Sequence, residues 1–275
     1  MPSPARRCLV VLDASAPIGV FDSGLGGISV LAEIRRRLPG EDLVYVADSA
    51  HVPYGGHAAS FIVSRSLALS NFLVGEGAKA IVVACNTATA AAVPALRARL
   101  AVPIVGMEPA VKPAAAATRS GVVGVLATAG TLRSARFAAL LERFGERIRV
   151  VTEPCPGLVE RVERGALDDR TTRGLVRRHL APLLAARADV VILGCTHYSF
   201  LRPVIAQEAG PGVAVIDTAD AVARQLERRL AELSLIRSAD APGSTRFLTS
   251  GPVEALDAVL PVLWSGAATT APLPA

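Results

Sequence analysis

Residues 18–38, IGVFDSGLGGISVLAEIRRRL, decide the fold class. The segment from Pro17 to Phe21 is a short apolar run of the kind that forms a buried strand. The glycine-rich turn DSGLGG follows, and a helical pattern then runs from Gly26 to Leu38. A strand, a tight turn and a helix in this order indicate the beginning of an α/β unit.

The same alternation continues along the chain. Further buried strands are predicted at short runs rich in Val and Ile, namely LVYVAD, AIVVAC, PIVGM, GVVGVLA, RIRVVTEPC, DVVILGC and VAVID. Helices are predicted between them over residues 58–75, 87–100, 131–144, 157–164 and 169–187. Strands that alternate with helices favour parallel sheets covered by helices on both faces.

The pattern restarts near the middle of the chain. In the first half a strand leads into DSGLGG and a later strand ends at Cys85. In the second half GVVGVLA leads into TAGTLRS and a later strand ends at Cys195. The interval from Asp22 to Cys85 and that from Thr128 to Cys195 differ by only a few residues. A duplicated α/β unit explains both coincidences.

The restart divides the chain into expected domains. The first α/β domain is expected over residues 17–107 and 218–264, because TRFLTSG and a last helix return to complete it. The second α/β domain is expected over residues 108–217. Residues 1–16 and 265–275 are expected to be flexible termini, since ATTAPLPA has the composition of a tail.

The composition excludes several classes of protein. Hydrophobic residues make up 51% of the chain and charged residues 19%, which is typical of a globular protein. The net charge of +5 is compatible with binding to nucleic acid. However, the arginines scatter along predicted helices, and aromatic residues, at 4% of the chain, are too few to stack bases. Four cysteines without a CxxC pair fit neither a disulfide scaffold nor a zinc site. We therefore expect no metal and no nucleic acid.

The sequence carries no membrane or export signal that we recognise. The apolar run from Cys8 to Leu12 is shorter than the about 7–15 residues of a signal-peptide core. No stretch reaches the about 18 continuous apolar residues of a membrane helix. We therefore expect a cytoplasmic protein with reduced thiols and no membrane association.

Two cysteine turns carry the predicted chemistry. In parallel α/β sheets ligands bind beyond the carboxyl ends of the strands, where Asp22, Cys85 and Cys195 are expected. Each cysteine precedes a residue suited to capping a helix, and the positive end of that helix is expected to lower the pKa of the thiol. A lone strand-end cysteine is usually a small packed hydrophobe, but two matched turns favour function. Cys155 is expected to pack rather than to act as a base.

Polar side chains flank these turns: Asp22, Ser23, Asn86, Thr87, Thr196 and His197. The glycines of DSGLGG expose backbone N–H groups that are expected to cradle an anion. The turn has neither the G-x-G-x-x-G spacing of a dinucleotide site nor the GK[ST] of a phosphate loop. The set suits a small zwitterion better than a cofactor.

Six motifs follow one another in a known order: IGVFDSGLGG, YVADSAHVPYG, VVACNTATA, GMEPAVKPA, CPGLVE and VILGCTHYS. In order and spacing they resemble the glutamate racemases, within the aspartate/glutamate racemase superfamily, over roughly residues 18–252. The resemblance implies two pseudo-symmetric parallel-sheet α/β domains with the active site between them, no cofactor, and a homodimer. It also implies a glutamate racemase, an isomerase that supplies D-glutamate for peptidoglycan synthesis, cell wall biogenesis and cell shape.

The resemblance also implies roles for single residues. Cys85 and Cys195 are the implied proton donors and acceptors, on opposite faces of the substrate carbon, because one base cannot reach both faces. Asp22 and His197 are implied to steer the protons. Substrate binding is implied for Asp22, Ser23, Tyr54, Gly55, Asn86, Thr87, Thr196 and His197. Two further acids fall in motifs that hold acidic residues of the family's site: Asp48 and Glu160.

Other interpretations stay open. An aspartate racemase, or another amino-acid racemase of the superfamily, shares the same logic, although DSGLGG favours glutamate. A cysteine hydrolase would use a single thiol with a histidine, and a non-catalytic binding or regulatory protein would bind without turnover. The chain departs from the family pattern at Ser199, in HAASF and in TSGPVEAL, where Gly-Asp-Pro is common. None of these departures touches a proposed acid or base.

Overall fold

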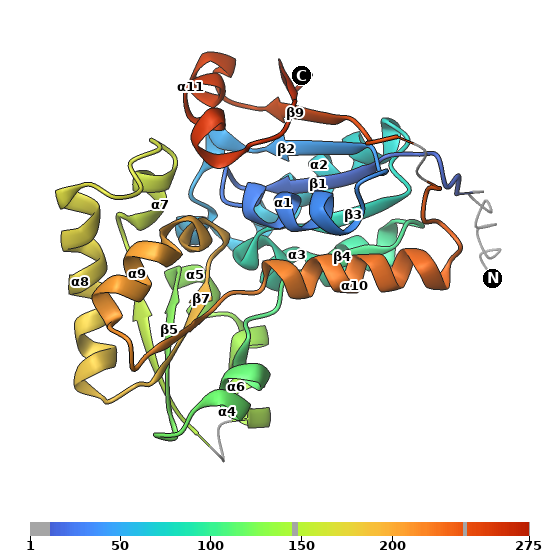
Figure 1. Cartoon of the computed structure of the whole chain (residues 1–275). Helices are drawn as coiled ribbons and strands as arrows, with labels where there is room; N and C mark the ends of the chain where they lie inside the picture. The colour runs from blue at the N-terminus through green and yellow to red at the C-terminus, as the bar shows by residue number, and fades with distance from the viewer. Residues whose placement is uncertain (1–11, 145–147, 239–240, 275) are drawn as a thin grey trace.

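The structure, a computed structural model, describes residues 12–144, 148–238 and 241–274. Its strands form two separate sheets (Figure 1). The larger sheet contains β1 (Ile18–Asp22), β2 (Leu43–Ala47), β3 (Ala80–Val83), β4 (Ile104–Gly106), β9 (Thr245–Thr249) and β10 (Thr269–Pro272). The smaller sheet contains β5 (Val122–Ala127), β6 (Arg149–Pro154), β7 (Val190–Gly194) and β8 (Ala214–Ile216). Every pairing is parallel, so the predicted α/β class is confirmed.

Helices connect these strands. Around the larger sheet lie α1 (Ile28–Arg37), α2 (Ala59–Gly75), α3 (Asn86–Arg99), α10 (Ala219–Glu232), α11 (Val253–Leu263) and the short 3₁₀ helices η1 (Ser49–His51) and η2 (Tyr54–Gly56). Around the smaller sheet lie α4 (Val111–Ala117), α5 (Ala129–Leu132), α6 (Ala135–Phe144), α7 (Leu158–Val162), α8 (Arg170–Ala185), α9 (Arg202–Ala209) and the 3₁₀ helix η3 (Thr196–Leu201). Within the described ranges, no helix has the length and apolar character needed to cross a membrane.

One predicted helix, over residues 131–144, is divided in the structure into α5 and α6. The break lies at Ser134, whose hydroxyl accepts a hydrogen bond from the backbone N of Phe137 at 3.1 Å. A serine in this position offers the start of α6 a cap, and local capping of this kind competes with a continuous helix.

Both sheets share one topology. The larger sheet has the strand order β10-β9-β2-β1-β3-β4, and the smaller sheet has the order β6-β5-β7-β8. The four strands β2-β1-β3-β4 therefore correspond in order and direction to β6-β5-β7-β8. This confirms the pseudo-symmetric pair of α/β units. The residues that follow β3 and β7 consequently stand at equivalent points of the two halves.

Each sheet is covered on both faces. In the larger half, Ile18 and Val20 pack on the side of α1, α10 and α11, whereas Phe21 packs on the side of α2 and α3. In the smaller half, Val125 packs with α4 and α6, and Leu126 packs with α8 and α9. The cluster beneath α1 and α10 continues into the α8 and α9 side of the smaller sheet. One apolar core therefore joins the two halves near their strand ends.

The C-terminal segment corrects one expectation. The flexible terminus predicted over residues 265–275 is wrong for Thr269–Pro272, because β10 pairs in parallel with β9 along its whole length. The uncovered edge of β9 offers backbone groups that a following segment can satisfy, and Leu273 N also donates to Thr249 O at 2.7 Å. A tail composition does not reveal such an edge.

The other predicted boundaries are those of the N-terminal segment and of the two domains. Residues 1–11 of the other predicted flexible terminus lie outside the described residues. The larger sheet draws its strands from 18–106 and 245–272, and the smaller sheet from 122–216. The domain limits at 17–107 with 218–264, and at 108–217, stay predictions.

Candidate active site

The carboxyl ends of β1, β3, β5 and β7 surround a narrow cavity between the two halves. Its volume of about 270 Å³ includes space that is open to solvent. The cavity is lined by Asp22, Ser23, Pro53, Tyr54, Gly55, Cys85, Asn86, Thr87, Thr128, Val159, Cys195, Thr196 and His197. Both halves contribute, as expected for a ligand site beyond the ends of parallel strands.

The structure brings together every residue that the sequence analysis assigned to catalysis or substrate binding. The two less specific acids are not among the lining residues. Asp48 lies behind Tyr54, whose hydroxyl donates to its carboxylate at 2.5 Å. Glu160 is exposed and lines a neighbouring, more apolar cavity instead. The placement thus favours a direct role for neither acid.

Cys85 joins β3 to α3. Its sulfur accepts a hydrogen bond from Ala88 N at 3.5 Å and lies 3.8 Å from Ser23 Oγ. Burial raises the pKa of the Cys85 thiol well above its ordinary value, and the negative charge of Asp22 raises it further. The Ala88 amide lowers this pKa, but by less. The predicted lowering by the helix terminus is therefore wrong here, because burial and a neighbouring carboxylate outweigh it.

Cys195 follows β7 at the equivalent point of the second half. Its sulfur lies 3.7 Å from Nδ1 of His197, and Nε2 of the same ring lies 2.6 Å from Glu163 Oε1. Burial alone would lower the pKa of His197, but hydrogen bonds and charges from Cys195 and Glu163 raise it well above its ordinary value. A protonated imidazole beside a thiol stabilises the thiolate. Cys195, His197 and Glu163 therefore form one connected set.

Asp22 connects the surroundings of Cys85 with those of Cys195. Its carboxylate is fully buried and accepts hydrogen bonds from Ser23 N at 2.6 Å and from Gly27 N at 2.6 Å. It also accepts one from Thr196 Oγ1, in the other half, at 3.1 Å. Burial raises the pKa of Asp22, while the charge of His197 and the hydrogen bond to Cys85 lower it in part. The carboxyl group is thus held beside the first thiol with an elevated proton affinity.

The glycine-rich turn does not form an open anion cradle, which corrects a second expectation. Leu25 N donates to Glu163 Oε1 at 2.7 Å, and Gly26 N lies 3.2 Å from His197 Nε2. These amides meet side chains of the other half, so they are not free to bind an anion. A Cβ on Gly24 would lie 2.2 Å from Glu163 Oε1, and one on Gly26 would lie 2.2 Å from His197 Nδ1. At Gly26 the contact includes the His197 backbone N at 2.6 Å, so glycine is required there because the two halves approach so closely.

Asn86 presents a polar group that the protein itself leaves unpaired. The side chain is buried, and neither its nitrogen nor its oxygen has a hydrogen-bond partner among the described residues. An unpaired buried amide costs about 1–3 kcal/mol. Such a group in a cavity wall is suited to binding a polar ligand.

The sequence analysis missed two polar residues of this site. Glu163 stands one helical turn after Glu160, and the motif CPGLVE draws attention only to the first acid. Thr128 occupies the place in the second half that Asp22 occupies in the first, so the internal repeat was a signal for it. The hydroxyl of Thr128 lies 2.9 Å from that of Thr87, which joins the two halves on another side of the cavity.

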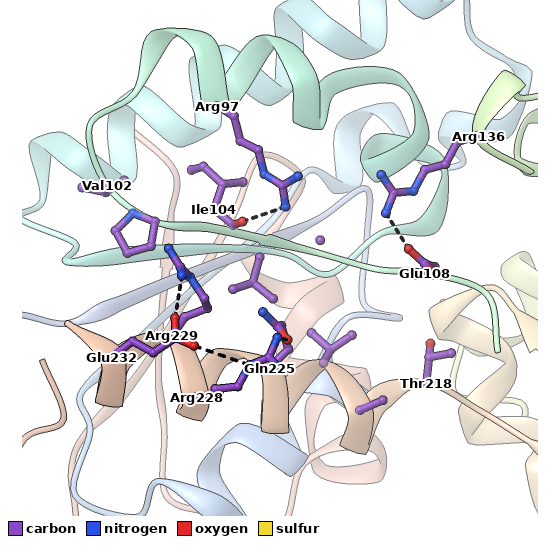
Figure 2. A pocket seen from close by; sticks show the side chains of 15 residues that line it. Arg97, Val102, Ile104, Glu108, Arg136, Thr218, Gln225, Arg228, Arg229 and Glu232 are labelled. Carbon is purple, nitrogen blue, oxygen red and sulfur yellow. Dashed lines mark hydrogen bonds and ion pairs between the residues drawn. The ribbon is translucent and has the colours of Figure 1, made fainter. Parts of the chain in front are cut away.

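A second, polar groove lies beside α10 and β4 (Figure 2). Its charged residues are Arg97, Glu108, Arg136, Arg228, Arg229 and Glu232. Arg136 pairs with Glu108 at 3.0 Å, and Arg229 pairs with Glu232 at 2.6 Å. The described residues that line this groove include no cysteine and none of those around the thiol cavity. The groove therefore lacks the paired thiols and cannot carry the same chemistry.

The thiol cavity has the parts of a two-sided proton-transfer site. Each half supplies one thiol from an equivalent position, and each thiol has its own partner for protons, Asp22 for Cys85 and His197 for Cys195. Such a set can remove a proton from one face of a small molecule and return one to the other face.

The chain is similar to known racemases in sequence and structure. A family model described as Asp/Glu/hydantoin racemase matches residues 18–226. A glutamate racemase from Pseudomonas paraeruginosa is 59% identical over 251 residues, which cover 91% of this chain and 94% of that protein. One from Methylococcus capsulatus is 55% identical over 259 residues, covering 94% and 96%.

Solved structures agree. The glutamate racemase of Escherichia coli, in complex with L-glutamate and the activator UDP-MurNAc-Ala, superposes with a TM-score of 0.83 at 32% identity, covering 94% of this chain and 98% of that chain. An aspartate racemase from Picrophilus torridus gives a TM-score of 0.50 at 18% identity, covering 80% and 99%. The second likeness concerns the fold alone.

Proposed function

The chain belongs to the Asp/Glu/hydantoin racemase family, and on that premise we propose that it interconverts L- and D-glutamate without a cofactor. The main observation that supports this proposal is that two thiols line one cavity. They come from equivalent points of the two duplicated halves. Identities of 59% and 55% with glutamate racemases, over 91% and 94% of this chain, support glutamate as the substrate. The D-glutamate product serves peptidoglycan synthesis.

In the proposed reaction one thiolate removes the Cα proton and the opposite thiol replaces it. When Cys85 is the base, its sulfur takes the proton as the Cα–H bond breaks, and the electron pair moves onto the α-carboxylate. Cys195 then gives its S–H proton to the other face and becomes the thiolate. The reverse direction exchanges these roles, so the number of protons on the enzyme is unchanged over each turnover.

The partner groups account for how each thiol becomes reactive. Asp22, with its raised pKa, is suited to accept the Cys85 proton and to return it. The His197 imidazole, held by Glu163, provides the corresponding positive charge beside Cys195. General acid–base assistance of this kind contributes about 10²–10⁴-fold to a rate.

Polar lining residues bind the substrate in this proposal. We assign the α-carboxylate and ammonium groups to Asn86, whose amide has no partner among the described residues, and to Thr87. Thr196 and His197 are assigned to substrate binding beside Cys195. Donors aimed at the carboxylate stabilise the charge that develops on it, by about 3–4 kcal/mol for a well-placed group. Tyr54 and Gly55 form a further wall of the cavity.

Single-thiol variants test the mechanism. Cys85→Ala and Cys195→Ala should each lower racemisation at least about 10³-fold, because each removes the base for one enantiomer and the acid for the other. Circular dichroism would follow the conversion of L- and of D-glutamate. The matched control is Cys155→Ala, a buried cysteine outside the thiol cavity, which should keep its turnover. Near-wild-type turnover in both active-site variants would refute the two-thiol proposal and favour a different chemistry.

Exchange of the α-proton with deuterated solvent separates the competing functions. A racemase should exchange this proton when glutamate alone is supplied, whereas a cysteine hydrolase or a binding protein should not. Aspartate supplied under the same conditions tests the nearest alternative. Exchange with aspartate but not with glutamate would overturn the substrate assignment.

We also propose a homodimer, which the family resemblance supports, and a location in the cytoplasm, which the sequence predicts. Sedimentation equilibrium should return twice the mass of the chain. A single-chain mass at micromolar concentration would contradict the dimer, and recovery with the membrane fraction of lysed cells would contradict the compartment.

A further inference from the structure

We propose that Asp48 is a positioning residue, whose buried carboxylate anchors the loop 53–56 that forms one wall of the substrate cavity. The inference rests on the proposed function, because it assigns that wall to glutamate binding. It concerns a side chain that does not itself line the cavity.

The carboxylate of Asp48 gathers hydrogen bonds from several parts of the chain. The side chain is fully buried and follows β2 directly. Arg65, on α2, donates from Nη2 at 2.7 Å and from Nε at 2.9 Å. Tyr54 donates from its hydroxyl at 2.5 Å, and Ser250, after β9, donates at 2.8 Å. His51 Nδ1 lies 3.0 Å away. A two-pronged guanidinium contact fixes direction as well as distance.

These contacts tie the loop to rigid elements. Arg65 belongs to α2, and Ser250 belongs to the turn between β9 and α11. The backbone N of Asp48 also donates to the carbonyl of Asp22, the acid beside the first thiol, at 3.0 Å. The loop is therefore held from two sides and connected to the strand end that carries the chemistry.

The anchored loop supplies one wall of the site. Pro53, Tyr54 and Gly55 line the thiol cavity, and Tyr54 is almost fully buried. Because the Tyr54 hydroxyl is bound to Asp48, it serves as a tether, and the wall consists of the ring and the neighbouring backbone. A Cβ on Gly55 would lie 3.0 Å from Thr128 Cβ, so this wall also meets the other half.

The Asp48 carboxylate keeps its negative charge at neutral pH. Burial alone would raise the pKa of Asp48, but hydrogen bonds from its side-chain partners lower it to about 2. The group is therefore ionised throughout the neutral range and transfers no proton there.

The proposal predicts a change in substrate affinity rather than in chemistry. Asp48→Asn should raise KM for both glutamate enantiomers about tenfold while kcat stays within about threefold, because the wall contacts substrate and transition state alike. Ser250→Ala, which removes one donor and keeps the carboxylate, should raise KM about two- to threefold, and Ser250→Thr should restore it.

Asp189 provides the matched control. Its carboxylate accepts hydrogen bonds from Thr118 Oγ1 at 2.5 Å, Arg119 N at 2.8 Å and Ser120 N at 2.9 Å. It precedes β7 and thus lies at the opposite end of that strand from Cys195. Asp189→Asn should lower the melting temperature but leave KM unchanged. A merely structural Asp48 would behave in the same way.

Amide hydrogen exchange provides a readout that does not require turnover. Asp48→Asn should accelerate exchange in residues 49–57, and Asp189→Asn should not. Unchanged KM and unchanged exchange in Asp48→Asn would overturn the proposal, as would a loss confined to kcat. Should Asp48→Asn fail to fold, an unchanged KM in Ser250→Ala would overturn it. If the wild type does not turn over glutamate, the proposed function fails, whereas the exchange comparison still tests the anchor.

Discussion

Gly26 is the position where one added methyl group tests the closed arrangement of the two halves. Its backbone N lies 3.2 Å from His197 Nε2. A Cβ at this position would lie 2.2 Å from His197 Nδ1 and 2.6 Å from His197 N. Gly26→Ala therefore forces either the imidazole or the DSGLGG turn to move.

The distances set the size of the effect. Ordinary contacts of a Cβ begin near 3.4 Å, so the methyl group and Nδ1 must separate by about 1 Å. Nδ1 is the atom that faces the Cys195 sulfur at 3.7 Å. A displacement of 1 Å at a reacting centre can cost about 10²-fold in rate. We expect kcat of Gly26→Ala to fall about 100-fold in both directions.

Initial rates with L- and with D-glutamate, followed by circular dichroism, would measure this loss. The matched control is Gly174→Ala, on the exposed side of α8, where the added Cβ meets no described atom within 4 Å apart from its chain neighbours and the local helix backbone. The control should keep its kcat and gain about 0.5–1 kcal/mol of stability, because alanine suits a helix interior better than glycine.

The result that would refute this reasoning is a folded Gly26→Ala protein, with a wild-type melting temperature, whose kcat lies within about threefold of the Gly174→Ala control. The contact between the turn and His197 would then be irrelevant to turnover. A loss of kcat with an unchanged melting temperature would instead locate the effect in the site.

Three further predictions concern charge and burial. Glu163→Gln removes a group that raises the pKa of His197, so the alkaline limb of the pH–kcat profile should move to lower pH and kcat at neutral pH should fall about tenfold; an unmoved limb would contradict the pairing. Asp48 has a folded pKa of about 2 against an ordinary 3.8, so its contribution to stability is complete above that ordinary value and is lost as the pH falls toward 2. Urea unfolding should show the wild type losing about 2 kcal/mol more than Asp48→Asn over that interval, and parallel pH curves would be evidence against the buried anchor. Ser70→Ala deletes a buried hydroxyl that has no hydrogen-bond partner among the described residues, so stability should stay equal or rise by up to about 1 kcal/mol, and a clear loss would reveal a missing partner.

Much of the site could be predicted from the chain because its signals are local. A strand that ends at Cys85 and another that ends at Cys195 can be recognised from short apolar runs, and parallel topology places such ends together. The polar neighbours follow directly in sequence, so they arrive at the cavity with the thiols. Their place in the cavity needed no knowledge of packing.

Other features depend on contacts between distant segments. Glu160 lies on α7 and Glu163 directly follows that helix. Only the packing of this segment against the DSGLGG turn directs Glu163 toward His197. The strand at residues 269–272 forms because β9 presents a free edge with which it can pair. The amino-acid composition of the C-terminal segment does not predict that edge.

The order of strands and helices, the internal repeat and the paired thiols could all be inferred from the chain, because periodicity and strand-end position are properties of short segments. The proton affinities could not. The pKa of Cys85 rises because the folded halves exclude water and place Asp22 beside the sulfur. Burial and long-range partners exist only after the chain has closed on itself, and they govern which groups hold protons.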